Sequence, residues 1–414
     1  MEPERREEIL GSFANACASG DLSLINHTWS RFYYDLVGAK GVFVVNDSKY
    51  EKPLLPLDAI FKSKCFLKGW LKSRRLGLIQ NSGSSTPFTY GGYILADTNF
   101  VSYCNCVFLG KDLGDNTEAF HAVSNYLMPN RAGLVAICYM VENFHQRTLP
   151  QVRESIKAFA AFKFADPEAF SKTGKIVPTI SESRLQEIIN SVLADMESQD
   201  FKTLYERMRQ NYLVGKIALT QMAVIEFGSN KQRTLQGKLL ELLKFFDKEV
   251  SMLPQLELIV ACKYFELRNN EPFFKKIQRN SKELLFSINS MAWDIAHWRN
   301  AMDLMLVTSV TGNGPYFPIP YFLTFDAGFA ALLGQIQLNG VIFHGQNRLY
   351  EAIHDLNLFQ TLSCVFEGEG EQIISPDAIS KRKSRLAAID NHTTHLEHLV
   401  QTCIQKLNTV LPSA

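Results

Sequence analysis

Two aspartates follow short apolar runs that are typical of buried strands. Asp97 comes directly after the run 93–96, and Asp326 lies just beyond the run 321–324. In an open parallel sheet, functional groups gather beyond the carboxyl ends of the strands, so we expect the two carboxylates to lie close together. Two carboxylates in one place repel each other unless a cation lies between them.

The cation that suits such a cluster is Mg²⁺ or Mn²⁺, because hard cations prefer oxygen ligands. Beside a phosphodiester, such an ion polarises a phosphoryl oxygen and lowers the pKa of a bound water, which then attacks in line. The pattern around Asp97 and Asp326 therefore predicts metal-dependent phosphodiester hydrolysis, with Mg²⁺ or Mn²⁺ as the cofactor.

Two further acids complete the expected cluster. Glu142 ends the run Ile-Cys-Tyr-Met-Val-Glu, which fits a helix. The other position is Asp294 or Asp303, nine residues apart on one expected helix. At about 100° per residue they face nearly opposite sides of that helix, so both cannot reach one ion. We favour Asp294, because Ser290 is a suitable N-cap and a helix N-terminus stabilises a carboxylate, and we keep Asp303 as the alternative.

These residues resemble the motifs of PIN-domain nucleases. The segment 96–102, Ala-Asp-Thr-Asn-Phe-Val-Ser, is similar to the family's opening motif, and 323–326, Leu-Thr-Phe-Asp, resembles its late Thr-x-Asp motif. The strand expected at 341–343 matches the family's closing β-unit. The resemblance implies four catalytic acids, of which the three aspartates bind the metal: Asp97, Glu142, Asp294 and Asp326. It also implies supporting groups that orient a carboxylate or a metal-bound water, namely Thr98, Asn99, Ser102 and Thr324.

The same resemblance implies an α/β fold, a PIN-like three-layer sandwich with a mostly parallel central sheet, to which a helical insertion and a C-terminal helix are added. The nuclease domain would comprise 90–149 and 281–346, interrupted by a helical insertion at 150–280 whose apolar residues recur at helical spacing. Residues 1–89 would form an N-terminal extension packed on this domain, and 347–414 a C-terminal helical region.

A basic stretch at 61–75 is a candidate surface for nucleic acid. It holds cationic residues with aromatic residues between them and no acid, a composition that can follow a phosphate backbone and stack bases. Solvated lysines on a partly buried helix explain the pattern as well. Because 43 basic residues nearly balance 42 acidic ones, a nucleic acid would have to be held by a local patch of this kind. The cationic residues are Lys62, Lys64, Lys68, Lys72, Arg74 and Arg75.

The eight cysteines are scattered without a disulfide framework, which favours reduced thiols in a cytoplasmic protein. The first residues are charged and lack the apolar core of a signal peptide. No window reaches the roughly 18 uninterrupted apolar residues that a membrane span needs, so we expect no membrane partner.

Structural explanations compete with the nuclease hypothesis. Asp-Thr-Asn after a strand is also a favourable turn sequence, and a single helical glutamate such as Glu142 is ordinarily solvated. Three other functions stay open: a catalytically inactive PIN-like scaffold, a metal-dependent nucleotide phosphohydrolase with a closed pocket, and a helical interaction protein. Members of the PIN-domain family mostly cut RNA. Under the nuclease hypothesis, RNA is therefore favoured over DNA as the substrate. A role as toxin or defence effector, a regulatory protein bound through the insertion, and a homo-oligomer are further expectations by analogy.

Overall fold

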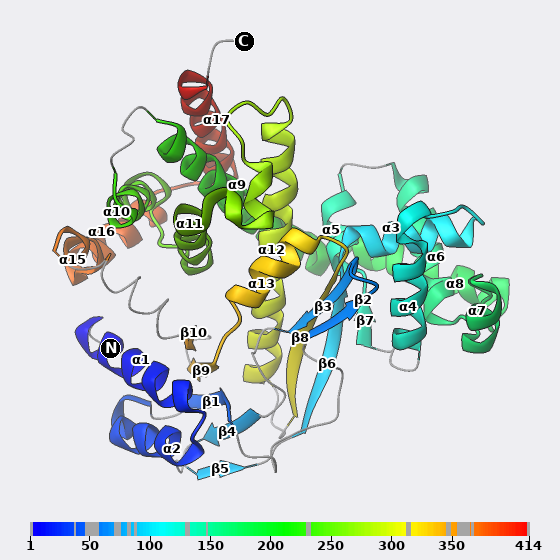
Figure 1. Cartoon of the computed structure of the whole chain (residues 1–414), viewed down its shortest axis with the longest axis horizontal. Helices are drawn as coiled ribbons and strands as arrows, with labels where there is room; N and C mark the ends of the chain where they lie inside the picture. The colour runs from blue at the N-terminus through cyan, green and yellow to red at the C-terminus, as the bar shows by residue number, and fades with distance from the viewer. Residues whose placement is uncertain are drawn as a thin grey trace.

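The computed structural model of the chain describes residues 3–36, 39–45, 58–69, 76–80, 84–86, 89–128, 133–145, 148–228, 233–311, 316–344, 349–353, 365 and 368–411. The two N-terminal helices, α1 (Pro3–Ser19) and α2 (Leu22–Arg31), lie beside a small sheet. A second sheet lies next to two long central helices, α9 (Gln199–Phe227) and α12 (Leu284–Thr311), and shorter helices flank this centre on both sides (Figure 1).

The protein is mostly helical, and the predicted PIN-like three-layer α/β sandwich with a mostly parallel central sheet is wrong. The helices of the described residues are α1 (Pro3–Ser19), α2 (Leu22–Arg31), α3 (Thr98–Phe108), α4 (Thr117–Leu127), α5 (Ile137–Asn143), α6 (Leu149–Lys163), α7 (Pro167–Thr173), α8 (Glu182–Glu197), α9 (Gln199–Phe227), α10 (Leu235–Phe245), α11 (Gln255–Leu267), α12 (Leu284–Thr311), α13 (Ala327–Gln335), α15 (Glu369–Ile374), α16 (Pro376–Ala387) and α17 (His392–Val410). A π-helical turn, η5 (Phe246–Val250), follows α10, and a 3₁₀ turn, η7 (Pro272–Lys276), precedes α12.

The sheet that carries the candidate acids is mixed rather than mostly parallel. Its central strands β6 (Thr89–Ala96) and β8 (Tyr316–Thr324) run parallel, with Ala96 opposite Leu323, and the short β7 (Leu134–Val135) lies parallel to β6 on the other side. Beyond β8 the direction reverses, because β3 (Cys65–Gly69) and β2 (Asp58–Phe61) form an antiparallel hairpin against it. The parallel pair brings the ends of β6 and β8 to one edge.

The strand predicted at 341–343 lies in a different sheet. It is part of β9 (Gly340–His344), which pairs antiparallel with β1 (Ala39–Val44) and β10 (Leu349–Ile353). On its other side β1 pairs with β4 (Leu76–Gln80), and β4 with β5 (Ser84–Thr86), also antiparallel. The place beside β8 is filled by β3, whose alternating buried residues Cys65 and Leu67 suit that position. The expected closing β-unit is therefore absent from the first sheet as far as the structure describes it.

Two long helices, α9 and α12, cross the middle of the molecule beside this sheet (Figure 1). They approach closely at Gly215, where an added Cβ would come within 3.4 Å of the Ala292 carbonyl oxygen. Helix α12 begins at Leu284, so Ser290 lies inside it and does not cap it, contrary to the sequence prediction. Asp294 is therefore an interior residue of a buried helix, and the helix N-terminus does not stabilise its charge.

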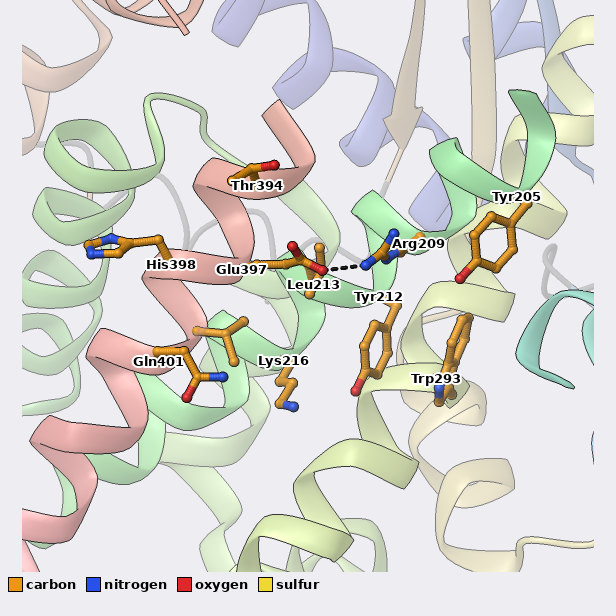
Figure 2. A pocket seen from close by; sticks show the side chains of 11 residues that line it. Tyr205, Arg209, Tyr212, Leu213, Lys216, Trp293, Thr394, Glu397, His398 and Gln401 are labelled. Atoms are coloured by element: carbon orange, nitrogen blue, oxygen red, sulfur yellow. Dashed lines mark hydrogen bonds and ion pairs between the residues drawn. The ribbon is translucent and has the colours of Figure 1, made fainter. Parts of the chain in front are cut away.

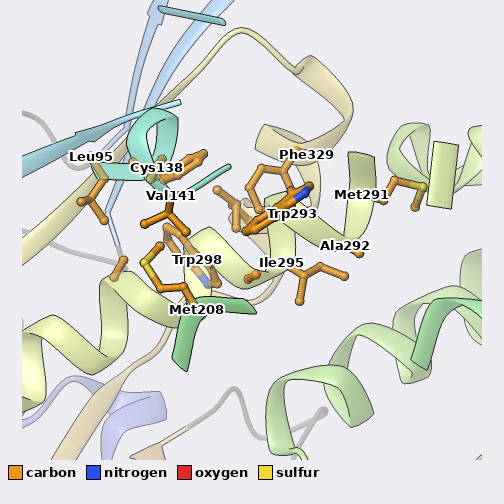
Figure 3. Close-up of a cluster of buried hydrophobic side chains, with 14 of the residues drawn as sticks. Leu95, Cys138, Val141, Met208, Met291, Ala292, Trp293, Ile295, Trp298 and Phe329 are labelled. Carbon is orange, nitrogen blue, oxygen red and sulfur yellow. The ribbon is translucent and has the colours of Figure 1, made fainter. Parts of the chain in front are cut away.

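The apolar core has two parts. The larger one spans the first sheet and most of the helices. Figure 3 shows its part around α12, where Trp293 and Trp298 belong to the same cluster as Leu95 of β6 and Val141 of α5. The smaller one joins α1 and α2 to the second sheet. In it Phe13 stacks on Phe43 with centroids 5.2 Å apart. No helix in the described part of the chain is long and apolar enough to cross a membrane.

Candidate active site

Asp97 joins the ends of the two parallel strands. It caps α3, with its Oδ1 accepting a hydrogen bond from the Phe100 N–H at 2.7 Å. Its Oδ2 accepts one from the Phe325 N–H, just past β8, at 3.1 Å. Burial raises the pKa of Asp97 to about 6, against the effect of these amides and of the Thr324 hydroxyl, and the Glu142 charge raises it further. Asp97 is thus a buried carboxylate whose two oxygens are already bound by the backbone.

Asp326 caps the next helix at the same edge. Its Oδ1 accepts a hydrogen bond from the Phe329 N–H of α13 at 2.9 Å. Its Oδ2 forms an ion pair with the ammonium of Lys276, which lies in η7, within the segment 150–280 that was expected to be a helical insertion. The buried Thr324 hydroxyl accepts a hydrogen bond from the Asp326 N–H at 3.0 Å and also acts on Asp97, so it links the two acids.

Glu142 reaches the cluster from α5. It accepts a short hydrogen bond from the Thr98 hydroxyl, at the start of α3. Its Oε2 also lies 3.5 Å from Nε2 of His297, a buried residue of α12. Burial lowers the pKa of His297, but its contacts with Cys138 and with the Glu142 carboxylate outweigh this and raise it. A protonated His297 beside Glu142 therefore compensates part of the negative charge in this corner.

Asp294 lies among the other acids on the face of α12 that carries His297. Burial raises the pKa of Asp294 well above its ordinary value, and the charges of Asp326 and Glu142 raise it further, whereas Lys276 and His297 act in the opposite sense. Among the described residues, none donates a hydrogen bond to its carboxylate and none forms an ion pair with it. Asp294 is the one acid of the four without such a partner in this part of the chain.

The alternative third acid lies apart from this group. Asp303 accepts a hydrogen bond from the Asn211 amide at 3.5 Å. Burial raises the pKa of Asp303, and the charges of Arg299 and Arg207 oppose that effect. None of the other candidate acids influences Asp303, so the fold brings Asp294 to the cluster and places Asp303 elsewhere on α12.

Two of the expected supporting residues make no hydrogen bond to the acids within the described chain. Asn99 is exposed in the first turn of α3, and Ser102 is partly exposed one turn later. Thr98 and Thr324, by contrast, bind Glu142 and Asp326 respectively. The cluster consists of four carboxylates, two hydroxyls, one imidazole and one ammonium.

The donor chemistry of this cluster fits Mg²⁺ or Mn²⁺, since the ligands are carboxylate oxygens and Asp294 has no donor of its own. Within the part of the chain that the structure describes, however, no three acidic, histidine or cysteine side chains converge as a ready-made ion site. Asp97, Glu142 and Asp326 are each bound by protein groups instead. A divalent cation at Asp294 would have to compete with Lys276 for Asp326.

The described part of the basic stretch, 61–69, belongs to a hairpin, and the partly buried helix considered for the stretch is wrong for these residues. Lys62 and Ser63 make the turn between β2 and β3 with positive φ of 52° and 57°. Since Phe66 lies opposite Thr324, this turn projects from the edge of the sheet that carries the acids. Lys62 is exposed there, Lys64 forms an exposed ion pair with Asp115 at 3.5 Å, and Lys68 lies on β3. The other three residues, Lys72, Arg74 and Arg75, lie outside the described residues.

The predicted site leaves out two members of the cluster. His297 follows Asp294 by one helical turn, a spacing that could bring it to the site, but an ordinary polar position is the preferred explanation from the sequence. Lys276 has no such signal, because it comes from the helical block and reaches Asp326 only through the packing of η7 on α13.

Comparisons with known proteins add no relative. No protein-family model, no curated protein and no solved structure matches this chain. The resemblance to PIN-domain nucleases therefore rests on the residues of the two motifs alone.

Proposed function

We propose that this chain is a metal-dependent nuclease that hydrolyses phosphodiester bonds at the cluster of Asp97, Glu142, Asp294 and Asp326. We favour RNA over DNA as its substrate. One observation carries the proposal: Asp294, a carboxylate without a donor, lies within electrostatic reach of Asp326 and Glu142, beside the ends of parallel strands. A partly buried carboxylate without a donor among like charges destabilises a fold, which argues for a function that needs it. The motif residues at 96–102 and 323–326 support the same assignment.

The roles of the residues follow from their surroundings. Asp294, Asp326 and Asp97 would hold Mg²⁺ or Mn²⁺, which when bound supplies the polarisation of a phosphoryl oxygen and an acidified water. Glu142 is fixed by Thr98 and His297, so it can orient a water or accept its proton. Lys276 neutralises Asp326, and a cation bound by Asp326 would have to replace this ammonium.

Lys276 also favours a second candidate function, binding of nucleic acid without cleavage. An ammonium on Asp326 already compensates part of the negative charge that a metal would compensate. In such a scaffold Asp97 and Asp326 would be structural caps. We place either activity in the cytoplasm, since the described cysteines are free thiols, as a reducing compartment keeps them.

The deciding experiment is cleavage of end-labelled single-stranded RNA, single-stranded DNA and duplex DNA, with Mn²⁺, with Mg²⁺ and with chelator. Asp294→Asn removes the unpartnered carboxylate, and Asp303→Asn is its matched control on the same helix. We expect metal-dependent cutting by the wild type and by Asp303→Asn. Asp294→Asn should lose at least about 100-fold, because even groups that only support a metal ligand cost 10–100-fold. Binding without cutting by all three proteins would favour the scaffold.

A further inference from the structure

A cavity opens between α9, α17 and the Trp293 region of α12 (Figure 2). Its volume is about 570 Å³, within the usual range of ligand pockets. Tyr205, Arg209, Tyr212 and Lys216 enter from α9, and His398 and Gln401 from α17. The lining therefore combines aromatic rings with cationic, amide and carboxylate groups, the last from Glu397.

A ladder of rings connects this cavity with the candidate acids. Tyr212 stacks on Trp293 with centroids 4.3 Å apart and an interplanar angle of 17°. Trp293 stacks in turn on His297, at 5.4 Å and 23°. His297 lies 3.5 Å from Glu142, whose charge also contributes to the raised pKa of Tyr212 after the larger effect of burial. The stacked rings of Tyr212, Trp293 and His297 thus connect the pocket with the acid cluster.

Lys216 gives the pocket an uncompensated positive charge. Its ammonium lies over the Tyr212 ring, 5.8 Å from the centroid. No carboxylate within the described residues forms an ion pair with it, and burial lowers its pKa. An ammonium that is partly desolvated and meets only a ring lacks the anion that would stabilise it, so it indicates a negatively charged ligand.

A second cation of the lining can adapt to such a ligand. Arg209 pairs with Glu397 of α17, the dashed line in Figure 2, and more loosely with Glu206 at 3.7 Å. About a third of the Arg209 side chain is exposed, so this pair is not locked in the core. An anion in the cavity would find a second cation there, and Gln401, elsewhere in the lining, has both a donor and an acceptor for a base edge.

We propose that this pocket binds an unpaired nucleotide of single-stranded nucleic acid, with its base on the Tyr212 ring in the place that the Lys216 ammonium occupies, and with that ammonium moved onto the adjoining phosphate. Only unstacked bases expose the faces that an aromatic ring needs, so the pocket selects single strands over duplex. The inference rests on the proposed nuclease in one respect: the strand held here is the one that the acid cluster cuts.

The test is binding in chelator, where nothing is cut. The probe is a labelled single strand of about 12 nucleotides, as RNA and as DNA, next to the matching duplex. Anisotropy gives Kd over a range of salt concentrations. Lys216→Ala should weaken single-strand binding and reduce the slope of log K against log salt by about 0.7, the loss of one phosphate contact. Lys216→Arg should keep both values. Lys202→Ala removes an exposed lysine of the same helix and should change neither.

The ring is tested in the same assay. Tyr212→Ala should weaken single-strand binding about 5- to 100-fold, whereas Tyr212→Phe, which keeps the ring, should bind as the wild type does.

The measurements distinguish an incorrect pocket proposal from an incorrect nuclease proposal. Single-strand affinity and salt slope unchanged in Lys216→Ala, or equal affinity for duplex, would overturn the pocket even if the wild type cuts. Binding of free uridine or adenosine monophosphate without any binding of the strand would overturn it as well. Loss of affinity in Lys216→Ala in a protein that never cuts would support the pocket and reject only the nuclease.

Discussion

At the scale of single residues, two of the four acids have a structural role, helix capping. Capping and the proposed metal binding produce the same sequence pattern, an aspartate after a strand. Asp97 and Asp326 cap helices α3 and α13, and an aspartate after a strand is as good a cap as it is a ligand. The variants that separate the two roles are therefore those at residues that do not cap, above all Asp294.

Asp294→Asn should stabilise the protein at neutral pH. Its raised pKa means that the ionised carboxylate is less favourable in the folded chain than in the unfolded one, so removing the charge relieves the repulsion from Asp326 and Glu142. We expect a gain of about 1 kcal/mol in urea denaturation, in line with the trade-off between stability and function. Asp195→Asn, at an exposed position, should stay within about 0.5 kcal/mol of the wild type. A destabilised Asp294→Asn would show that the carboxylate has a stabilising partner.

Thr324 should matter for stability through its hydroxyl. Thr324→Val keeps the shape but leaves the Asp326 N–H without its acceptor and removes a donor from Asp97. The expected cost is about 1–3 kcal/mol in thermal or urea unfolding. Thr324→Ser retains the hydroxyl and should lose less than Thr324→Val. A larger loss in Thr324→Ser than in Thr324→Val would mean that the methyl group, which fills a buried site, is the important part.

At the scale of elements, the sequence predicted the strands β6 and β8 and their shared edge, because each is an apolar run followed by an aspartate. It did not predict their neighbours. The strands 341–343 and 65–69 are both short and apolar, and only long-range packing decides that β3 lies beside β8 while β9 pairs with β1. The same limit applies to Lys276, whose place depends on the contact between η7 and α13.

Gly328 lies at the contact between η7 and α13. An added Cβ would come within 2.9 Å of the Phe273 nitrogen and 3.1 Å of Asp326 Oδ1. Gly328→Ala should therefore cost about 1–3 kcal/mol and move η7, with Lys276, away from Asp326. Gly334→Ala, on the same helix, would meet only the Lys68 ammonium at 3.7 Å, so it should be neutral or stabilising by about 0.5–1 kcal/mol. Thermal unfolding of the two variants compares them directly, and equal stability would refute the close packing of η7.

At the scale of the whole molecule, the two apolar cores stabilise different parts of the fold. The larger core holds the sheet edge, the four acids and the ring ladder, whereas the smaller one joins α1 and α2 to the second sheet (Figure 1). The N-terminal helices thus contribute to folding at a distance from the candidate chemistry, although β2 and β3 from the same region of the chain belong to the first sheet.

Trp29→Ala tests that division. Trp29 is 1% exposed and meets Phe13 and Phe43 edge to face, so its removal should cost about 3–5 kcal/mol. Cleavage per folded molecule at low temperature should stay within about threefold of the wild type, a change below 1 kcal/mol in the barrier. A far larger loss of activity in a folded variant would mean that the N-terminal core also shapes the acid cluster.

The central claim is that the acid cluster binds a divalent cation through Asp294. The direct measurement is Mn²⁺ binding, followed by the paramagnetic resonance of the free ion, in the wild type, Asp294→Asn and Asp303→Asn, each with an uncleavable phosphorothioate single strand present. We predict equal Mn²⁺ affinity for the wild type and Asp303→Asn, and at least about tenfold weaker binding by Asp294→Asn. Absence of Mn²⁺ binding by the wild type, or equal binding by all three proteins, would contradict the claim.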